Sequence, residues 1–168
     1  MDTADELLTT LATLAGARLQ ARGLLLATAE SCTGGWVAEA VTAIAGSSAW
    51  FDRGFITYSN EAKQDMLGVS AATLERHGAV SEATAHAMAA GALRCSRAGI
   101  ALAVTGVAGP GGGSADKPVG MVCFAWATKG GTADALTRQF DGDRGAVRRQ
   151  SVIVALQGVI ERLDEDVT

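Results

Sequence analysis

The chain has 168 residues, 48% of them hydrophobic and only 5% aromatic, which predicts one domain whose core is built from small side chains. Its net charge of −4 at pH 7 argues against a nucleic-acid-binding protein, because such a surface needs concentrated Lys and Arg. Three widely spaced cysteines suit neither a disulfide framework nor a zinc site, and no signal peptide or membrane-spanning run is apparent, so a reducing, cytoplasmic location is expected.

Helices and strands are predicted to alternate through the first two thirds of the chain. Apolar residues at helical spacing indicate a helix over Asp5–Arg22, and the apolar run Leu24–Thr28 indicates a buried strand. Aromatic and β-branched residues favour a second strand at Trp50–Tyr58. Further helices are expected at Trp36–Ala43, Glu61–Leu67, Ala71–Arg76 and from Ser81 to about Arg97.

The last third is predicted to add a hairpin and a final helix. A third buried strand, Ile100–Thr105, leads into the loop Gly106–Gly120, which holds six glycines and both prolines of the chain. The elements expected next are strands at Val119–Thr128 and Ala133–Phe140 and a helix, capped by Asp141 or Asp143, that runs to about Leu163. This order predicts an α/β fold: a three-layer α/β sandwich with a mixed central sheet in a single domain.

The stretch Thr28–Gly35 joins the first strand to the helix that begins at Trp36. The N-terminal end of a helix is electropositive and exposes backbone N–H groups, so a turn there can hold an anion. Ser31 is the candidate nucleophile, with helix capping as the alternative role. The backbone N–H groups that could form its oxyanion hole belong to Cys32, Thr33, Gly34 and Gly35. The thiol of Cys32 is a rival nucleophile, since a thiolate is also favoured at this position.

A serine nucleophile needs a base, and the chain offers no clear histidine for that role. His77 and His86 both fall in helical segments that look peripheral, which weakens a Ser-His-Asp or Cys-His arrangement. Lys63 and Tyr58 lie where the second strand ends and a helix begins, so both side chains can reach one spot. Lysine can act as a base where burial lowers its pKa, and the alternative is a solvated surface lysine.

The loop Thr105–Ser114 invites a phosphate-binding interpretation. It lacks the G-K-[ST] of a Walker loop, does not match G-x-G-x-x-G, and leads into a strand. A free-standing glycine nest can still bind phosphate through its N–H groups, and a plain flexible loop is the alternative. The basic cluster formed by Arg144, Arg148 and Arg149 suits a single anionic group. No spacing of acidic residues and histidines indicates metal ligands, so no metal is expected, and acyl transfer by a serine needs no cofactor.

Four segments of the chain form a specific pattern when they are taken together. They are T-A-E-S-C-T-G-G (28–35), G-S-S-A-W-F-D-R-G-F-I-T-Y-S-N-E-A-K (46–63), H-G-A-V-S (77–81) and A-V-T-G-V-A-G-P-G-G-G-S-A-D-K-P-V-G (103–120). In this order they resemble the C-terminal domain of the competence/damage-inducible CinA family. The resemblance runs from about Leu8 to Arg162, within a single domain that is expected to span residues 1–168.

This resemblance implies a nicotinamide-nucleotide amidohydrolase, an enzyme of pyridine-nucleotide recycling that hydrolyses the carboxamide of nicotinamide mononucleotide (NMN). Its products would be nicotinate mononucleotide and ammonia. The family's serine nucleophile, assisted by lysine and tyrosine, maps to Ser31, Lys63 and Tyr58. The family's substrate-binding glycine loop maps to Thr105, Gly106, Gly109, Gly111, Gly112, Gly113 and Ser114, with Arg144 as a candidate charge partner for the phosphate.

Two other functions stay open on the sequence alone. One is a nucleotide-binding regulatory module that keeps the pocket without turnover, and the other is a thiol enzyme that uses Cys32. The small-residue helix around Ala83–Ala92 would also allow close subunit packing, so a homo-oligomer is compatible with the sequence.

Overall fold

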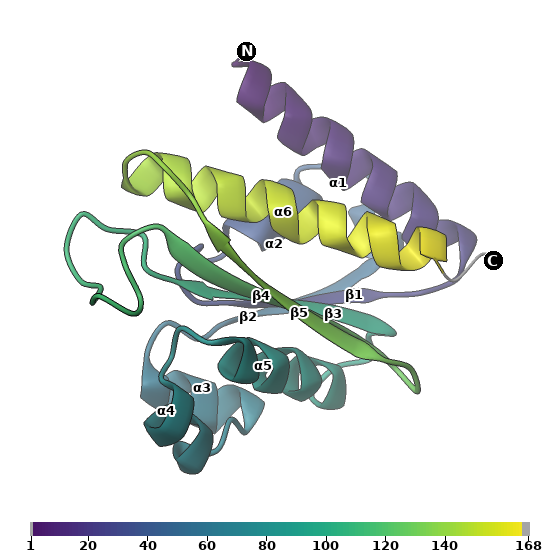
Figure 1. Cartoon of the computed structure of the whole chain (residues 1–168). Helices are drawn as coiled ribbons and strands as arrows, with labels where there is room; N and C mark the ends of the chain where they lie inside the picture. Colours follow the sequence, from purple (N-terminus) through teal and green to yellow (C-terminus); the bar gives the residue numbers. More distant parts are fainter. Residues whose placement is uncertain (1, 166–168) are drawn as a thin grey trace.

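A central five-stranded sheet organises the computed structural model, which describes residues 2–165 (Figure 1). Its strands are β1 (Leu26–Glu30), β2 (Phe51–Ile56), β3 (Ile100–Gly106), β4 (Met121–Thr128) and β5 (Ala133–Gln139). Their order across the sheet is β2-β1-β3-β4-β5. β1 is parallel to β2 and β3, whereas β4 is antiparallel to both of its neighbours, so the sheet is mixed as predicted. Residues 1 and 166–168 of the expected domain lie outside the described residues.

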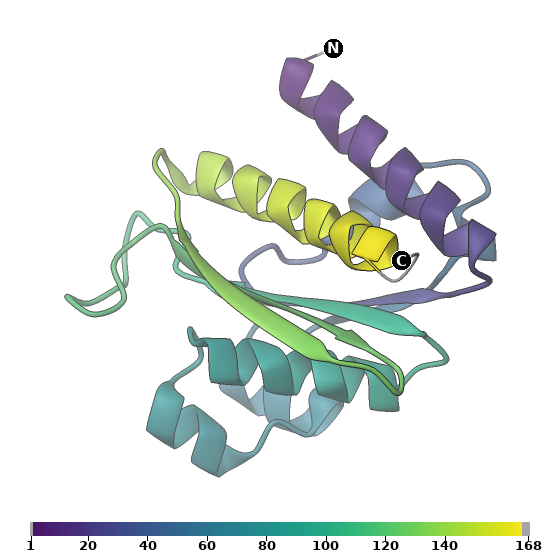
Figure 2. The ribbon, with the colours of Figure 1, turned by 45° about the vertical axis from the view of Figure 1, so that its right-hand side comes forward.

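Helices cover both faces of this sheet, which confirms the predicted three-layer α/β sandwich (Figure 1, Figure 2). The helices on one face are α1 (Thr3–Ala21), α2 (Trp36–Thr42) and α6 (Arg144–Glu165). Those on the other face are α3 (Asn60–Leu67), α4 (Ala71–His77) and α5 (Glu82–Arg94). Within residues 2–165, no helix combines the length and the apolar character needed to cross a membrane.

The two faces of the sheet carry side chains of different size. Along β3, Ile100, Leu102 and Val104 belong to the core cluster under α1 and α6, while Ala101 and Ala103 belong to the cluster under α5. Alanines of β1 and β4 continue this small face, so α5 meets the sheet through short side chains. Of the small residues of α5, which the sequence makes compatible with subunit contacts, Ala85, Ala89 and Ala92 are buried in the chain's own core, while Ala83, Ala87 and Ala90 are half-buried.

The connections after the parallel strands place three chain segments at one edge of the sheet. The chain leaves β1 for α2 on one face and leaves β2 for α3 on the other, as Figure 1 shows. Ligands of open α/β sheets bind in the crevice where such connections diverge, at the carboxyl ends of the strands. Glu30 at the end of β1 pairs with Ile56 at the end of β2, and the N–H of Thr57 donates to the Glu30 carbonyl (2.8 Å). The residues that follow β1, β2 and β3 therefore meet.

The observed elements differ from the sequence predictions mainly at their ends. β1 begins two residues later than the predicted Leu24–Thr28 strand and continues through Glu30, whose side chain is buried. The helix predicted to reach about Arg97 ends at Arg94. Between the two predicted caps of the last helix, Asp143 is the residue whose Oδ1 accepts a bond from the N–H of Ala146 (2.9 Å).

Gly91 of α5 generates a stability prediction because it packs against the backbone of α3. A Cβ atom at position 91 would lie 2.1 Å from the carbonyl oxygen of Leu67, so α3 would have to move. We expect Gly91→Ala to lower the free energy of unfolding by about 1–3 kcal/mol, as measured by urea denaturation. Gly145→Ala is the matched control, since its Cβ would meet Asp143 Oδ1 at an ordinary 3.5 Å and Ala favours the helix. Equal stability of the two variants would contradict the prediction.

Candidate active site

Ser31 lies directly after β1, in a turn that ends where α2 begins. Its N–H donates to the carbonyl of Val104 (2.9 Å), which extends the contact between β1 and β3. The N–H of Gly34 donates back to the Ser31 carbonyl (3.0 Å) and closes the turn. Gly34 and Gly35 have φ values of +60° and +102°, the left-handed region that favours glycine. The backbone is therefore fixed on both sides of the Ser31 hydroxyl.

The carboxylate of Glu30 organises this turn from inside the core, where the residue is only 1% exposed. Oε1 accepts bonds from the Thr33 hydroxyl (2.7 Å) and the Val37 N–H (2.8 Å), and Oε2 accepts one from the Ala38 N–H (3.0 Å). These bonds satisfy N–H groups that the first turn of a helix otherwise leaves unpaired. They explain why β1 continues through a charged residue, which the apolar run in the sequence did not reveal.

Lys63 of α3 reaches the Ser31 hydroxyl from the face of the sheet that α3 covers, opposite to the face covered by α2 (Figure 1). Its Nζ lies 3.1 Å from Ser31 Oγ and also donates to the carbonyls of Thr57 (3.0 Å) and Tyr58 (3.4 Å). The side chain belongs to a residue that is only 1% exposed, and this burial lowers the pKa of the Lys63 ammonium from its ordinary value of 10.5. Burial thus favours the neutral amine, the form that can accept a proton from Ser31.

Tyr58 contributes its backbone and its side chain to two different places. Its carbonyl lies 3.4 Å from Ser31 Oγ and faces Lys63, whereas the residue as a whole is 61% exposed. Its hydroxyl accepts a bond from Arg144 Nη2 (3.1 Å), and Arg144 Nη1 donates to the carbonyl of Gly109 (2.7 Å). The Tyr58 hydroxyl and Arg144 together form a rim between Ser31 and the glycine loop.

A cavity of about 340 Å³ lies between Ser31, Lys63 and the glycine loop. The predicted site residues that line it are Ser31, Cys32, Tyr58, Lys63, Thr105, Gly106, Gly109, Gly111, Gly112, Gly113 and Arg144. Ala79 and Val80, from the connection between α4 and α5, also line it and were not selected from the sequence. The structure therefore brings the candidate nucleophile, the candidate base and the candidate phosphate loop around one space.

Four predicted site residues lie outside the lining of this cavity. Thr33, Gly34 and Gly35 line a separate hollow on the other side of the turn. Ser114 instead closes the glycine loop on itself: its N–H donates to the Lys117 carbonyl (2.8 Å), and its hydroxyl accepts from the Lys117 N–H (3.2 Å). Among the four predicted oxyanion residues, Cys32 is thus the one that lines the cavity.

A family model for the CinA C-terminal domain matches residues 8–163 of the chain. The chain belongs to this family. The family expected from the four sequence motifs is confirmed, and the matched range contains every residue that lines the cavity.

Curated relatives and a solved structure agree with this assignment. The CinA domain is 58% identical over 142 residues to the nicotinamide-nucleotide amidohydrolase PncC of Escherichia coli (strain K12), with 84% of this chain and 86% of that protein covered. It is 52% identical over 154 residues to the protein of the same name from Pseudomonas putida, with 92% and 96% covered. The crystal structure of competence/damage inducible protein CihA from Agrobacterium tumefaciens matches it with a TM-score of 0.90 and 50% identity, covering 94% of this chain and 96% of that one.

Cys32 of the CinA domain lies beside Ser31 but lacks the properties of a thiol nucleophile. Burial raises the pKa of its thiol from 9.0 to about 12, so the group is protonated at neutral pH. The thiolate is the nucleophilic form of cysteine, and a raised pKa is typical of buried, inert thiols. The site therefore favours Ser31 over Cys32.

The three arginines that the sequence groups together separate in the structure. Arg144 lines the cavity, while Arg148 binds the carbonyls of Cys32 and Thr33. Arg149 pairs with carboxylates of the N-terminal segment, Asp2 and Asp5. A single cation of the cluster, Arg144, thus faces the space where a phosphate would bind.

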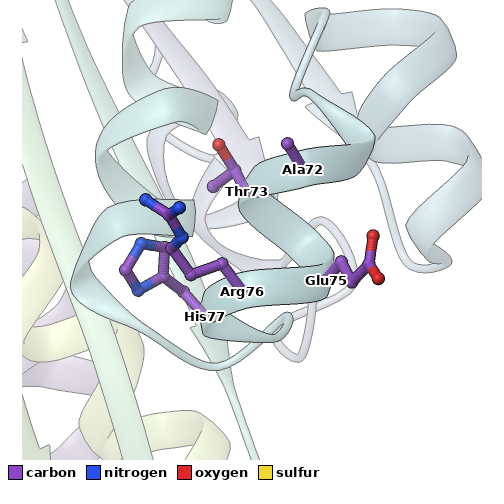
Figure 3. Close-up of a pocket in the computed structure, with 5 residues that line it drawn as sticks. All are labelled: Ala72, Thr73, Glu75, Arg76 and His77. Atoms are coloured by element: carbon purple, nitrogen blue, oxygen red, sulfur yellow. The ribbon is translucent and has the colours of Figure 1, made fainter.

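A roomier hollow of about 510 Å³ beside α4 carries no such chemistry (Figure 3). Its lining residues all come from α4: Ala72, Thr73, Glu75, Arg76 and His77. Figure 3 shows Arg76 and His77 projecting to one side of the helix and Glu75 to the other. His77 and His86 are both exposed, which agrees with their predicted peripheral position. Among residues 2–165, no group of three or more His, Cys, Asp or Glu side chains could hold a metal ion.

The burial of the cysteines predicts a pattern of thiol reactivity. Cys95 is exposed, whereas Cys32 and Cys123 are buried and burial raises the pKa of both thiols. At pH 8, Ellman's reagent should react rapidly with one thiol of the native protein and with all three after denaturation. The Cys95→Ser variant should lose the rapid phase. A second rapid thiol in the native protein would contradict the inert state of Cys32.

Proposed function

We propose that this CinA domain hydrolyses the carboxamide of NMN to give nicotinate mononucleotide and ammonia, the activity that the names of its 52–58% identical relatives state for those proteins. The observation that carries the proposal is the 3.1 Å distance between Ser31 Oγ and the buried Lys63 Nζ, at a cavity whose far wall is a glycine loop. A serine beside a buried amine suits acyl transfer. A glycine loop beside it suits a substrate that carries a phosphate.

In the proposed acylation step, neutral Lys63 takes the proton of the Ser31 hydroxyl while Oγ attacks the carboxamide carbon. The Thr57 and Tyr58 carbonyls accept bonds from the amine and hold it toward Ser31. The C–N bond of the tetrahedral intermediate then breaks. The leaving nitrogen receives the proton from the Lys63 ammonium and departs as ammonia, leaving an ester on Ser31.

Water completes the proposed cycle at the same groups. Lys63, neutral again, removes a proton from a water molecule that attacks the ester carbon. Collapse of the second tetrahedral intermediate breaks the bond to Oγ, and Ser31 regains its proton from Lys63. The product is a carboxylic acid, ionised at neutral pH, and the enzyme returns to its starting state.

Both intermediates carry a negative oxygen that needs hydrogen-bond donors. The N–H of Cys32 is the candidate that the geometry supports best, because Cys32 lines the cavity directly after Ser31. The N–H of Gly34 already donates to the Ser31 carbonyl. Removing one such donor in a comparable site costs about 3–4 kcal/mol of transition-state stabilisation.

The glycine loop and Arg144 supply the proposed phosphate and ribose site. The glycines at 109 and 111–113 line the cavity together with Ser31. Because glycine has no side chain, a ligand can approach the N–H groups of these residues closely. Arg144 holds the loop by its bond to the Gly109 carbonyl, and its charge faces the same space. We further propose a cytosolic location, which the three free cysteines support. Light scattering would measure whether the protein forms a homo-oligomer.

Ser31→Ala tests the proposed nucleophile directly. Without the hydroxyl no acyl-enzyme forms, so ammonia release from NMN should fall by about 10³-fold or more, while calorimetry still detects NMN binding. The exposed Ser48 provides the matched control, and Ser48→Ala should keep normal turnover. Near-normal turnover by Ser31→Ala would refute the assignment. NMN binding without ammonia release by the unmodified protein would instead indicate a regulatory binding module.

The lowered pKa of Lys63 predicts a pH dependence. The base must be neutral, so kcat/KM for NMN should fall as the pH falls through the Lys63 pKa, which burial places below 10.5. Lys63→Ala should lose about 10²-fold or more of kcat and this pH-dependent limb. Lys129→Ala, at an exposed turn, is the control. A Lys63→Ala variant with the limb intact would show that another group acts as the base.

A further inference from the structure

We propose that Arg148 is a positioning residue of this active site, which binds two turn carbonyls and thereby aims the backbone N–H of Cys32, directly after Ser31, at the cavity. The inference rests on the proposed amidohydrolase function and adds a residue to it. Arg148 does not line the cavity, so it acts through the turn and not on the substrate.

The guanidinium of Arg148 donates hydrogen bonds to the carbonyls of two successive peptide groups in the turn. Nε donates to the Cys32 carbonyl (3.1 Å), and Nη2 donates to the Thr33 carbonyl (3.0 Å). The guanidinium lies 5.4 Å from the centre of the Trp36 ring, so the indole supports it from one side. A planar fork held in this way fixes two carbonyl directions together, which a single ammonium does not do.

Peptide geometry converts these carbonyl directions into N–H directions. In a trans peptide the C=O and the next N–H point in opposite directions. The N–H groups of Thr33 and Gly34 therefore point away from Arg148, and that of Gly34 is indeed bonded to the Ser31 carbonyl. This bond in turn fixes the Ser31–Cys32 peptide, whose N–H end belongs to Cys32.

The result is a short relay from Arg148 to the proposed oxyanion donor. Cys32 lines the cavity with Ser31, while Arg148 lies in the hollow on the other side of the turn. A cation at the carbonyl end of a hydrogen-bonded chain also polarises its peptide groups, which strengthens their N–H ends as donors.

A different role for Arg148, as a phosphate ligand, makes the opposite kinetic prediction. Loss of a phosphate contact weakens substrate binding and raises KM. Loss of an interaction made only in the transition state lowers kcat and kcat/KM together. Because both hydrogen bonds of Arg148 go to the turn, we expect its removal to lower kcat and leave KM nearly unchanged.

The test compares Arg148→Ala with Arg149→Ala, using NMN as the substrate. Arg149 lies over the same Trp36 ring at 5.4 Å and is also a cation of α6, but it pairs with Asp2 and Asp5. Arg148→Ala should lower kcat by about 10- to 100-fold, keep KM within about threefold and retain the shape of the pH profile. Arg149→Ala should resemble the unmodified protein. Millimolar guanidinium ion should restore part of the kcat lost in Arg148→Ala.

Each other outcome has a defined meaning. Equal kcat for the two variants, or a raised KM with unchanged kcat in Arg148→Ala, would overturn the positioning role. If thermal melting shows that Arg148→Ala is unfolded, Arg148→Lys replaces it under the same criteria, because it keeps the charge but not the fork. No ammonia release from NMN by the unmodified protein would overturn the proposed function and this inference with it.

Discussion

The site depends on the hydrogen bonds that the buried carboxylate of Glu30 accepts. A carboxylate in a protein core is costly unless donors surround it, and here the Thr33 hydroxyl and two N–H groups of α2 do so. Because Glu30 is also the last residue of β1, these bonds tie the end of the strand to the start of the helix. Ser31 then has little conformational freedom, since it follows one fixed element and precedes another.

The three layers of the fold each contribute one part of the site. The sheet supplies Ser31 at its edge, α3 on one face supplies Lys63, and α6 on the other face supplies Arg148. The proposed base, Lys63, and the proposed positioning residue, Arg148, thus approach Ser31 from opposite sides of the sheet. Burial lowers the pKa of the Lys63 amine. The cavity opens at the edge where these layers meet the glycine loop.

The sequence predicted those features that depend on neighbouring residues. Periodicity located the helices and strands, a capping aspartate marked the start of the last helix, and the four motifs identified the family together with Ser31 and Lys63 as the candidate nucleophile and base. The roles of Glu30 and Arg148 were not predicted, because they depend on partners elsewhere in the chain. Glu30 caps a helix from seven residues away, and Arg148 binds carbonyls 115 and 116 residues earlier in the chain. The position of the Tyr58 hydroxyl beside Arg144 likewise depends on a contact across 86 residues. Only the folded chain shows such pairs.

The position of the Lys63 amine depends on how the parallel strands β1 and β2 are paired. The amine bonds to the carbonyls of Thr57 and Tyr58, just after β2, while Ser31 comes just after β1, so the strand register sets the distance between base and nucleophile. A slip of one residue between the strands would shift the Thr57 and Tyr58 carbonyls by about 3.3 Å relative to Ser31. This shift exceeds the 3.1 Å distance between Lys63 Nζ and Ser31 Oγ. β2 lies at the border of the sheet and is held on one side by β1. If Ser31 and Lys63 act as proposed, the alignment of this border strand is a catalytic parameter, and mutations in β2 far from the cavity act on turnover through it.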